Sequence, residues 1–207
     1  VEYSLRSSNT VTEHHEYVYM SGLLMRETIT TTANGTSTTE VLDFVYGSGS
    51  TPLALVYTNG TASPVTYYYV TNMQGDVVKL VRANGTTVAS YTYDAWGKVL
   101  TATGSMAEIN PIRYRGYYYD AETELYYLQS RYYNPEIGRF INADVQLIIG
   151  SDLTGLNLFA YCGNNPVNRI DETGCISSKI VKIAVKLYIR MHRRTLESTL
   201  SKSESKD

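Results

Sequence analysis

The ten residues from Tyr91 to Leu100 read YTYDAWGKVL and contain a strand, a tight turn and a second strand. Tyrosines at 91 and 93 flank one threonine, and an alternation of period two places both rings on one face of a strand. Asp94 can bond the backbone two residues on, and Gly97 can supply the positive φ of a tight turn. The stretch therefore predicts a β-hairpin.

The hairpin belongs to an internal repeat. The tripeptide Asn-Gly-Thr begins at Asn34, Asn59 and Asn84, a spacing of 25 residues both times. Asn-Gly is the strongest short hairpin signal, and a regular period indicates one supersecondary unit copied along the chain. A unit of this length holds two or three strands with their turns. The tripeptides also satisfy the N-glycosylation pattern, but their place in the repeat favours turns.

Composition supports the same fold class. Tyrosine accounts for 20 residues, against 3 Phe and 1 Trp, and charged residues make up 18% of the chain. Tyrosine, threonine and valine suit a half-buried pleated surface, where a tyrosine ring is buried and its hydroxyl stays wet. So few charges argue against wholesale disorder. The sequence predicts a mainly β chain.

The cysteine and histidine content predicts neither a metal nor a cofactor. The 2 Cys and 3 His residues do not amount to a disulfide framework or a four-ligand zinc site. The chain begins with Val1 and Glu2 and shows no apolar targeting segment. We therefore expect it to be the end piece of a longer polypeptide.

Charge divides the chain into a body and a tail. Residues 1–175 carry 10 Lys+Arg and 17 Asp+Glu, whereas residues 176–207 carry 8 and 3. An acidic body argues against nucleic-acid binding. In the tail, basic residues at 179, 182, 186, 190 and 193 share one face of a predicted amphipathic helix. Three interpretations stay open for this helix: a docked or solvated element, a truncated effector, and a peptide that acts at an anionic membrane surface.

The body resembles the Rhs family of bacterial polymorphic toxins. Residues 70–100 resemble the family's YD repeats, and residues 112–174 resemble its repeat-associated core domain. The core motifs are IRYRGYYYD (112–120), ETELYYL (122–128), RYYNP (131–135), GRFI (138–141), NLFAY (157–161), GNNPVN (163–168) and DETG (171–174). The resemblance covers about 70–174 well and 1–69 loosely.

The resemblance implies a part in toxin delivery. In the family, YD repeats form a spiral β-shell, and the core domain plugs one end just before a variable effector. We therefore expect an antiparallel hairpin sheet over 1–105, a core plug over 106–175 and a variable helical tail over 176–207. The implied partners are an upstream shell of the same polypeptide, a C-terminal effector and its immunity protein. The implied location is extracellular or the bacterial cell surface.

The resemblance also implies a site of self-cleavage. Two family aspartates in paired Asp-Pro-x-Gly motifs resemble an aspartic-protease dyad, and they fall on Asp144 and Asp171 here. Arg139 corresponds to an upstream arginine that biases their ionisation, and the cut falls near Gly174-Cys175. Two close carboxylates share one proton, so one acts as acid while the other activates water. Both motifs here lack the family's proline, and the first also lacks its glycine. The alternative is that both aspartates cap turns.

A carbohydrate-binding module is a further alternative. Acidic residues at 120, 122 and 124 lie between tyrosines, a combination that suits a sugar site, although the segment also reads as a turn. On this hypothesis exposed rings such as those of Tyr67 and Tyr69 contact the glycan. The arginines at 113, 115 and 131, which lie among tyrosines in the sequence, are expected to stack on rings and to pair with these acids as core struts.

Overall fold

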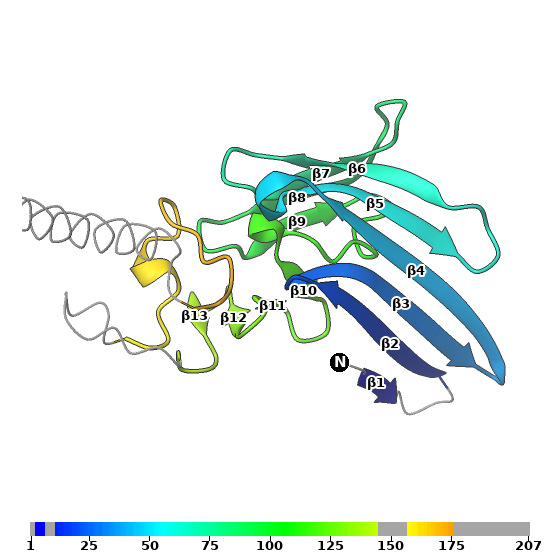
Figure 1. Ribbon diagram of the computed structural model, residues 1–207, viewed down its shortest axis with the longest axis horizontal. Helices are drawn as coiled ribbons and strands as arrows, with labels where there is room; N and C mark the ends of the chain where they lie inside the picture. The colour runs from blue at the N-terminus through cyan, green and yellow to red at the C-terminus, as the bar shows by residue number, and fades with distance from the viewer. Residues whose placement is uncertain (1–2, 7–10, 145–156, 176–207) are drawn as a thin grey trace, which may run out of the picture. The chain divides into compact units, whose positions relative to one another are not determined.

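The computed structural model describes residues 3–6, 11–144 and 157–175. It divides into two compact units, Val1–Glu124 and Leu125–Asp207. The first unit contains a nine-stranded sheet (Figure 1). Its strands are β1 (Tyr3–Arg6), β2 (Val11–Met20), β3 (Leu23–Ala33), β4 (Thr36–Tyr46), β5 (Pro52–Asn59), β6 (Val65–Thr71), β7 (Val77–Val81), β8 (Thr87–Tyr93) and β9 (Val99–Thr103). The predicted mainly β fold class is confirmed.

The sheet is a meander in which each strand pairs antiparallel with the next. The hairpin predicted between β8 and β9 is present. Its turn is closed by the Asp94 carboxylate, which accepts from the backbone N–H groups of Trp96 (2.8 Å) and Lys98 (2.9 Å). Gly97 has φ +92°, as the turn requires.

The three Asn-Gly-Thr sites all lie at strand ends, but their turns differ. Asn34 and Gly35 both have positive φ, 51° and 77°, and join β3 to β4 as a two-residue turn. At the second and third sites only Gly60 and Gly85 have positive φ. Those glycines lie in longer connections, so the repeat preserves the place of the turn and varies its geometry.

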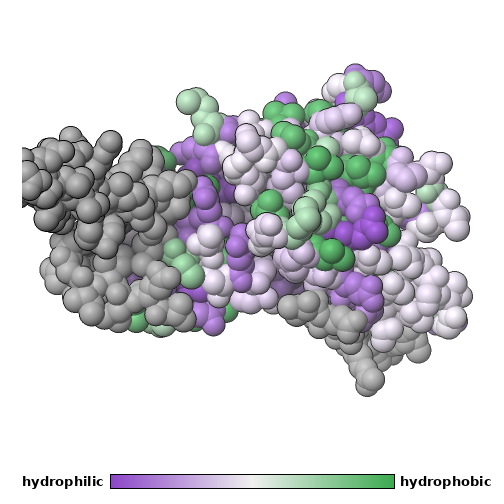
Figure 2. Space-filling view, viewed as in Figure 1, coloured by the Kyte–Doolittle hydropathy of each residue, from purple (hydrophilic) through white to green (hydrophobic). Residues whose placement is uncertain are grey.

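Tyrosine alternation places rings in the core of the first unit. Tyr67 is 5% exposed and Tyr69 packs against the same core, whereas Tyr68, between them, is 45% exposed. The opposite face of the sheet keeps apolar side chains in solvent, among them Val45 and Val70. Figure 2 shows such hydrophobic patches among the polar side chains of this unit.

The segment after β9 covers the core face of the sheet. Met106, Ala107 and Ile112 are each no more than 3% exposed. Tyr91 donates its hydroxyl to the Ala107 carbonyl (3.0 Å), and Tyr69 donates to the Asn110 side chain (2.8 Å). A buried tyrosine needs such an acceptor, so the covering segment satisfies the hydroxyls that its own packing removes from water.

The covering segment ends in the 3₁₀ turn η2 (Tyr114–Gly116) and strand β10 (Tyr118–Asp120). Sequence analysis drew the boundary at 105/106, whereas the compact units divide after Glu124. The segment from 106 to 124 belongs to the first unit because several of its apolar side chains complete the core of the sheet.

The second unit contains three short strands, β11 (Leu125–Tyr127), β12 (Tyr132–Asn134) and β13 (Arg139–Phe140), and the turn η4 (Cys162–Asn164). β12 pairs antiparallel with both of the others. Tyr133 is fully buried, and its ring lies 4.1 Å from that of Tyr161 and 5.9 Å from that of Phe140. This aromatic cluster holds the loops of the unit around β12. The predicted tail helix lies outside the described residues.

Candidate functional site

The two aspartates singled out from the sequence meet on one arginine in the second unit. An Nη nitrogen of Arg131 lies 2.8 Å from Asp144 Oδ2 and 3.5 Å from Asp171 Oδ2. All three side chains are buried, with 5%, 7% and 2% of their surfaces exposed. Because both oxygens contact a single nitrogen, their separation cannot exceed the sum of those two distances.

Arg131 also binds the backbone at the predicted cleavage point. Its Nε–H donates to the Gly174 carbonyl, and its other Nη donates to the Leu158 carbonyl (2.9 Å). The guanidinium carbon lies 3.6 Å from the centre of the Phe140 ring. The planar fork of an arginine allows these contacts at once, which a lysine ammonium could not reproduce.

Gly174 fits closely against the turn that precedes Arg131. It has φ +72°, and a Cβ at this position would lie 2.5 Å from the Leu128 carbonyl oxygen and 2.8 Å from Ser130 Oγ. The Ser130 hydroxyl lies 2.7 Å from the Thr173 carbonyl oxygen and 3.1 Å from Cys175 Sγ. Only glycine suits this backbone, so the chain around 174 is held at a defined place beside the aspartates.

Burial dominates the electrostatics of Asp171. It raises the pKa of the Asp171 carboxyl, and the charge of Arg131 and the backbone N–H groups of Thr173 and Gly174 lower it without cancelling that rise. The charge of Asp144 adds to the increase. Two neighbouring carboxyl groups, one of them with a raised pKa, are an arrangement in which one can act as proton donor and the other as base.

Sequence reasoning found the two carboxylates but named a different arginine. Arg139 is exposed on β13, and its backbone pairs with that of Asn134. Arg131 was expected to be a core strut stacked on a ring. Its stacking is confirmed, and its ionic partners are Asp144 and Asp171 in place of acids from the 120–124 segment. Nothing in the local sequence distinguishes Arg131 from Arg139, because the polar contacts of the Arg131 side chain are with residues 13 to 43 positions further along the chain.

The acidic segment between β10 and β11 forms the turn that sequence analysis offered as its alternative. Asp120 Oδ1 accepts from the Glu122 N–H (3.1 Å), and its Oδ2 accepts from the Thr123 hydroxyl (2.8 Å). The tyrosines named for glycan contact are not available for that role. Tyr67 is buried, and Tyr69 packs against the core with its hydroxyl bonded to Asn110. The expectation that these two rings are exposed is wrong, because alternation turns them to the core face.

The other two arginines also pack as struts in the first unit. Arg113 lies 4.4 Å from the centre of the Tyr119 ring, and it donates to the backbone carbonyl of Ala107 (3.0 Å). Arg115 lies 5.2 Å from the centre of the Tyr114 ring and donates to the Gln74 carbonyl (2.8 Å). Stacking on tyrosines is therefore confirmed for both, whereas the acid that lies 3.5 Å from Arg115 Nε is Asp76, outside the 120–124 segment.

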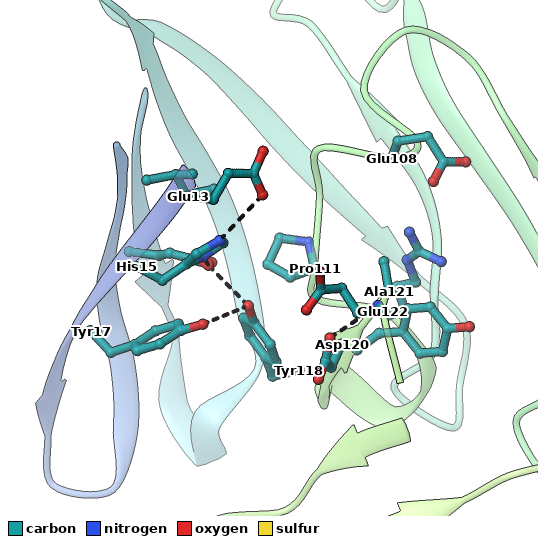
Figure 3. Close-up of a pocket in the computed structure, with 13 residues that line it drawn as sticks. Glu13, His15, Tyr17, Glu108, Pro111, Tyr118, Asp120, Ala121 and Glu122 are labelled. Atoms are coloured by element: carbon teal, nitrogen blue, oxygen red, sulfur yellow. Dashed lines mark hydrogen bonds and ion pairs between the residues drawn. The ribbon is translucent and has the colours of Figure 1, made fainter. Parts of the chain in front are cut away.

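The first unit contains a pocket of about 220 Å³ (Figure 3). Its walls include His15 and Tyr17 from β2, Glu27 from β3, and Tyr118 from β10. Glu27 is 2% exposed, and one of its oxygens lies 2.8 Å from His15 Nδ1 and 2.9 Å from the Tyr118 hydroxyl. Sequence reasoning missed this cluster, because its members lie 12 and 91 residues apart.

Neither a metal cluster nor a membrane-spanning helix occurs in the described ranges. Among residues 3–6, 11–144 and 157–175, no three His, Cys, Asp or Glu side chains are grouped to hold a metal ion. Over that same part of the chain no helix has the length and apolar character needed to cross a bilayer. Cys162 and Cys175, which both lie in the described ranges, form no disulfide.

The chain matches the model of a protein family described as teneurin YD-shell over residues 6–167. It is 44% identical over 110 residues to the tRNA nuclease WapA of Bacillus subtilis (strain 168), an alignment that covers 52% of this chain and 5% of WapA. It is also 44% identical over 71 residues to the toxin protein Tse5 of Pseudomonas aeruginosa, covering 34% of this chain and 5% of Tse5.

A solved structure shows the same fold. The crystal structure of TcdB2-TccC3-Cdc42 matches with a TM-score of 0.68 and 26% identity, covering 82% of this chain and 8% of that chain. These matches confirm the resemblance to Rhs and YD-repeat proteins. The chain spans only a small part of the length of these relatives.

Proposed function

The chain belongs to the teneurin YD-shell family, and from that premise we propose that it forms wall and end plug of a shell that carries a C-terminal toxin effector. The rest of the shell lies upstream in the same polypeptide, the effector lies downstream of Gly174, and an immunity protein is a separate partner of the effector. The polypeptide acts outside the cell or at the bacterial surface. The relatives WapA and Tse5, a tRNA nuclease and a toxin by name, support this proposal.

The observation that carries the proposal is the nine-stranded meander with its covering segment. A sheet whose strands pair in chain order can be extended by further repeats at either edge, since each edge strand has unpaired N–H and C=O groups. One face of the sheet is packed by tyrosines and by the covering segment, and the other face keeps apolar side chains in solvent. Exposed apolar patches are typical of surfaces that contact another chain, as the inner wall of a shell around an unfolded effector would.

Protease protection of the complete polypeptide, as its gene encodes it, tests this proposal. We expect trypsin to leave the lysine- and arginine-rich residues after 175 intact while the shell is folded. The same residues should be cut at once when the polypeptide is denatured. Cleavage of the folded polypeptide at the rate of a free peptide of the same sequence would contradict enclosure. Electron microscopy of the same sample should show hollow particles.

Self-cleavage at Gly174-Cys175 is a second candidate function, and the Arg131 contacts favour it. One guanidinium holds the Gly174 carbonyl and both carboxylates. In the proposed reaction Asp144 takes a proton from a water molecule that attacks this carbonyl carbon, and Arg131 Nε–H stabilises the oxyanion. Asp171 gives a proton to the departing amine of Cys175 as the C–N bond breaks. The products are a carboxylate at Gly174 and an amino terminus at Cys175.

Mass spectrometry of the purified chain during incubation tests this second candidate. We expect a fragment that ends at Gly174, and its loss in Asp144→Asn and Asp171→Asn. Asp120→Asn is the matched control, because Asp120 caps a turn in the first unit; it should cut as the parent does. An uncut parent chain that is folded by circular dichroism would remove self-cleavage and leave the shell proposal standing.

A further inference from the structure

Glu27 is a buried carboxylate with two donors from distant parts of the chain. His15, across the β2–β3 pair, places Nδ1 2.8 Å from Glu27 Oε1. Tyr118, in β10, donates its hydroxyl to the same oxygen at 2.9 Å. The cluster therefore links the first long hairpin of the sheet to the segment that covers its core face, and a link of this kind restrains the covering segment.

The Tyr17 ring completes the link. It packs edge-on against Tyr118, with ring centres 6.0 Å apart, and the two hydroxyls lie 3.4 Å from each other (Figure 3). Burial raises the pKa of both tyrosines well above the usual value, and the charge of Glu27 raises it further. Both hydroxyls therefore keep their protons throughout the physiological range, and histidine is the member of the cluster suited to titrate there.

The surroundings of His15 favour its charged form. Burial lowers the pKa of its ring, but the hydrogen bond and charge of Glu27 outweigh this, and the pKa lies above the usual 6.5. Glu13, on the same strand, lies 4.0 Å from Nε2, and it also raises the pKa, as does Glu122 from the turn after β10. The remaining charged groups that line the pocket are Glu108, Arg113 and Asp120.

We propose that His15, Glu27 and Tyr118 form a pH-sensitive latch that fastens β10 to β2 and β3. Protonated His15 neutralises the buried Glu27 carboxylate, and the latch is closed. When His15 loses its proton, Glu27 keeps the Tyr118 hydrogen bond but loses its opposite charge, at a position where its side chain is only 2% exposed. An uncompensated buried charge is costly, so the latch weakens.

The sign of the pH dependence follows from linkage. A histidine whose pKa is raised by folding contributes stability that is complete below its unfolded value of 6.5, and this contribution is lost as pH rises through the folded value. The latch is therefore strongest in mildly acidic solution and weakest in mildly alkaline solution. The inference depends on the fold of the first unit and stands whether or not the shell proposal does.

Histidine resonances of the unaltered chain provide the first test. His14 neighbours His15 on β2, faces the other side of the sheet and is 40% exposed, so its replacement is the matched control among the variants. Two-dimensional NMR between pH 5 and 9 should give a midpoint for His15 above the usual 6.5. A His15 midpoint at or below that value would overturn the proposal without any variant.

Variants provide the second test, with melting temperature as the readout. Between pH 5.5 and 8.5 we expect the parent to lose a few degrees more than His15→Gln, a shift on the order of 2–5 °C for a small unit. His14→Gln should follow the parent. In Glu27→Gln the burial of His15 acts without its counter-charge, and the His15 midpoint should fall. Parallel pH curves for the parent and His15→Gln would refute the latch.

Discussion

The two units hold their backbones in different ways. In the first unit each strand of the sheet pairs with its sequence neighbour, and an alternation of two residues decides which side chains enter the core. In the second unit only short strands occur among the described residues, and one side chain, that of Arg131, joins positions 144, 158, 171 and 174. The stability of the sheet is therefore spread over many similar strand pairings. The stability of the second unit depends more on the few contacts that meet at Arg131.

The substitution with the largest expected effect is Arg131→Met. Methionine retains much of the volume but leaves Asp144 and Asp171 buried without a counter-charge, which costs about 3–5 kcal/mol. Native-state hydrogen exchange of peptides from 125–144 and 157–175 should report this loss in free energy of unfolding. Peptides from the sheet should keep the exchange of the parent.

Arg139→Met is the matched control for that comparison. Arg139 is exposed on β13, so its replacement should change the free energy of unfolding by no more than about 0.5 kcal/mol. Equal losses for the two variants would show that an exposed arginine stabilises the second unit as much as Arg131 does, and that convergence on Arg131 is not the cause.

Gly97→Ala should have the next largest effect, and it tests the sheet at one turn. Gly97 has φ +92°, and a Cβ there would lie 2.5 Å from the Tyr114 ring. Positive φ and the clash together should cost about 2–3 kcal/mol. Urea unfolding followed by the fluorescence of Trp96, the adjacent residue, measures this loss.

Gly85→Ala separates the two parts of that cost. Gly85 has φ +83°, but no atom lies within 4 Å of the position its Cβ would take. The substitution should therefore cost only the backbone term, about 1–2 kcal/mol. If Gly97→Ala is no worse than Gly85→Ala, the contact with Tyr114 does not constrain the turn.

The difference between the units also explains what the sequence could predict. The 94–98 turn follows from residues within five positions of each other, and the chain's own alternation predicts which tyrosines share a face, although not that Tyr67 and Tyr69 face the core. Asp144 and Asp171 were found through family resemblance, because no periodicity marks them. The same resemblance assigned their arginine to position 139, whereas folding brings the guanidinium of Arg131 to both.

A similar limit applies inside the repeat. The tripeptide at Asn34 predicts a two-residue turn, and the structure has one, whereas the same three letters at Asn59 and Asn84 lie in longer connections. The length of the flanking strands decides the difference. β3 and β4 are 11 residues each and stay paired up to the turn, whereas β7 has only 5 residues. The turn residues determine where the chain reverses, and the extent of strand pairing determines how many residues the connection contains.

Tyr91→Phe tests whether the covering segment depends on hydroxyl bonds, with a smaller expected effect. The Tyr91 hydroxyl donates to the Ala107 carbonyl and lies 3.3 Å from the Asn110 amide nitrogen. Removing it takes away one of two donors to that carbonyl, which keeps its bond from Arg113, so we expect a loss of about 0.5–1.5 kcal/mol in the free energy of unfolding. Tyr68→Phe, on the exposed face, is the control and should be neutral in the same urea titration. A neutral Tyr91→Phe would mean that packing of the ring alone holds the segment.

The smallest expected effect concerns Arg26 and Asp43, which form a bidentate ion pair between β3 and β4 at 2.5 and 2.9 Å. Arg26, like Arg131, contacts two carboxylate oxygens, but the side chains of the Arg26–Asp43 pair are 52% and 34% exposed, so water competes for both charges. A double-mutant cycle with Arg26→Ala and Asp43→Ala should give a coupling of at most about 1 kcal/mol. That coupling should vanish in 1 M salt, where the screening length is only about 3 Å. A coupling that persists in salt would show that direct contact is sufficient to make an ion pair strong, and that burial is not what separates Arg131 from Arg26.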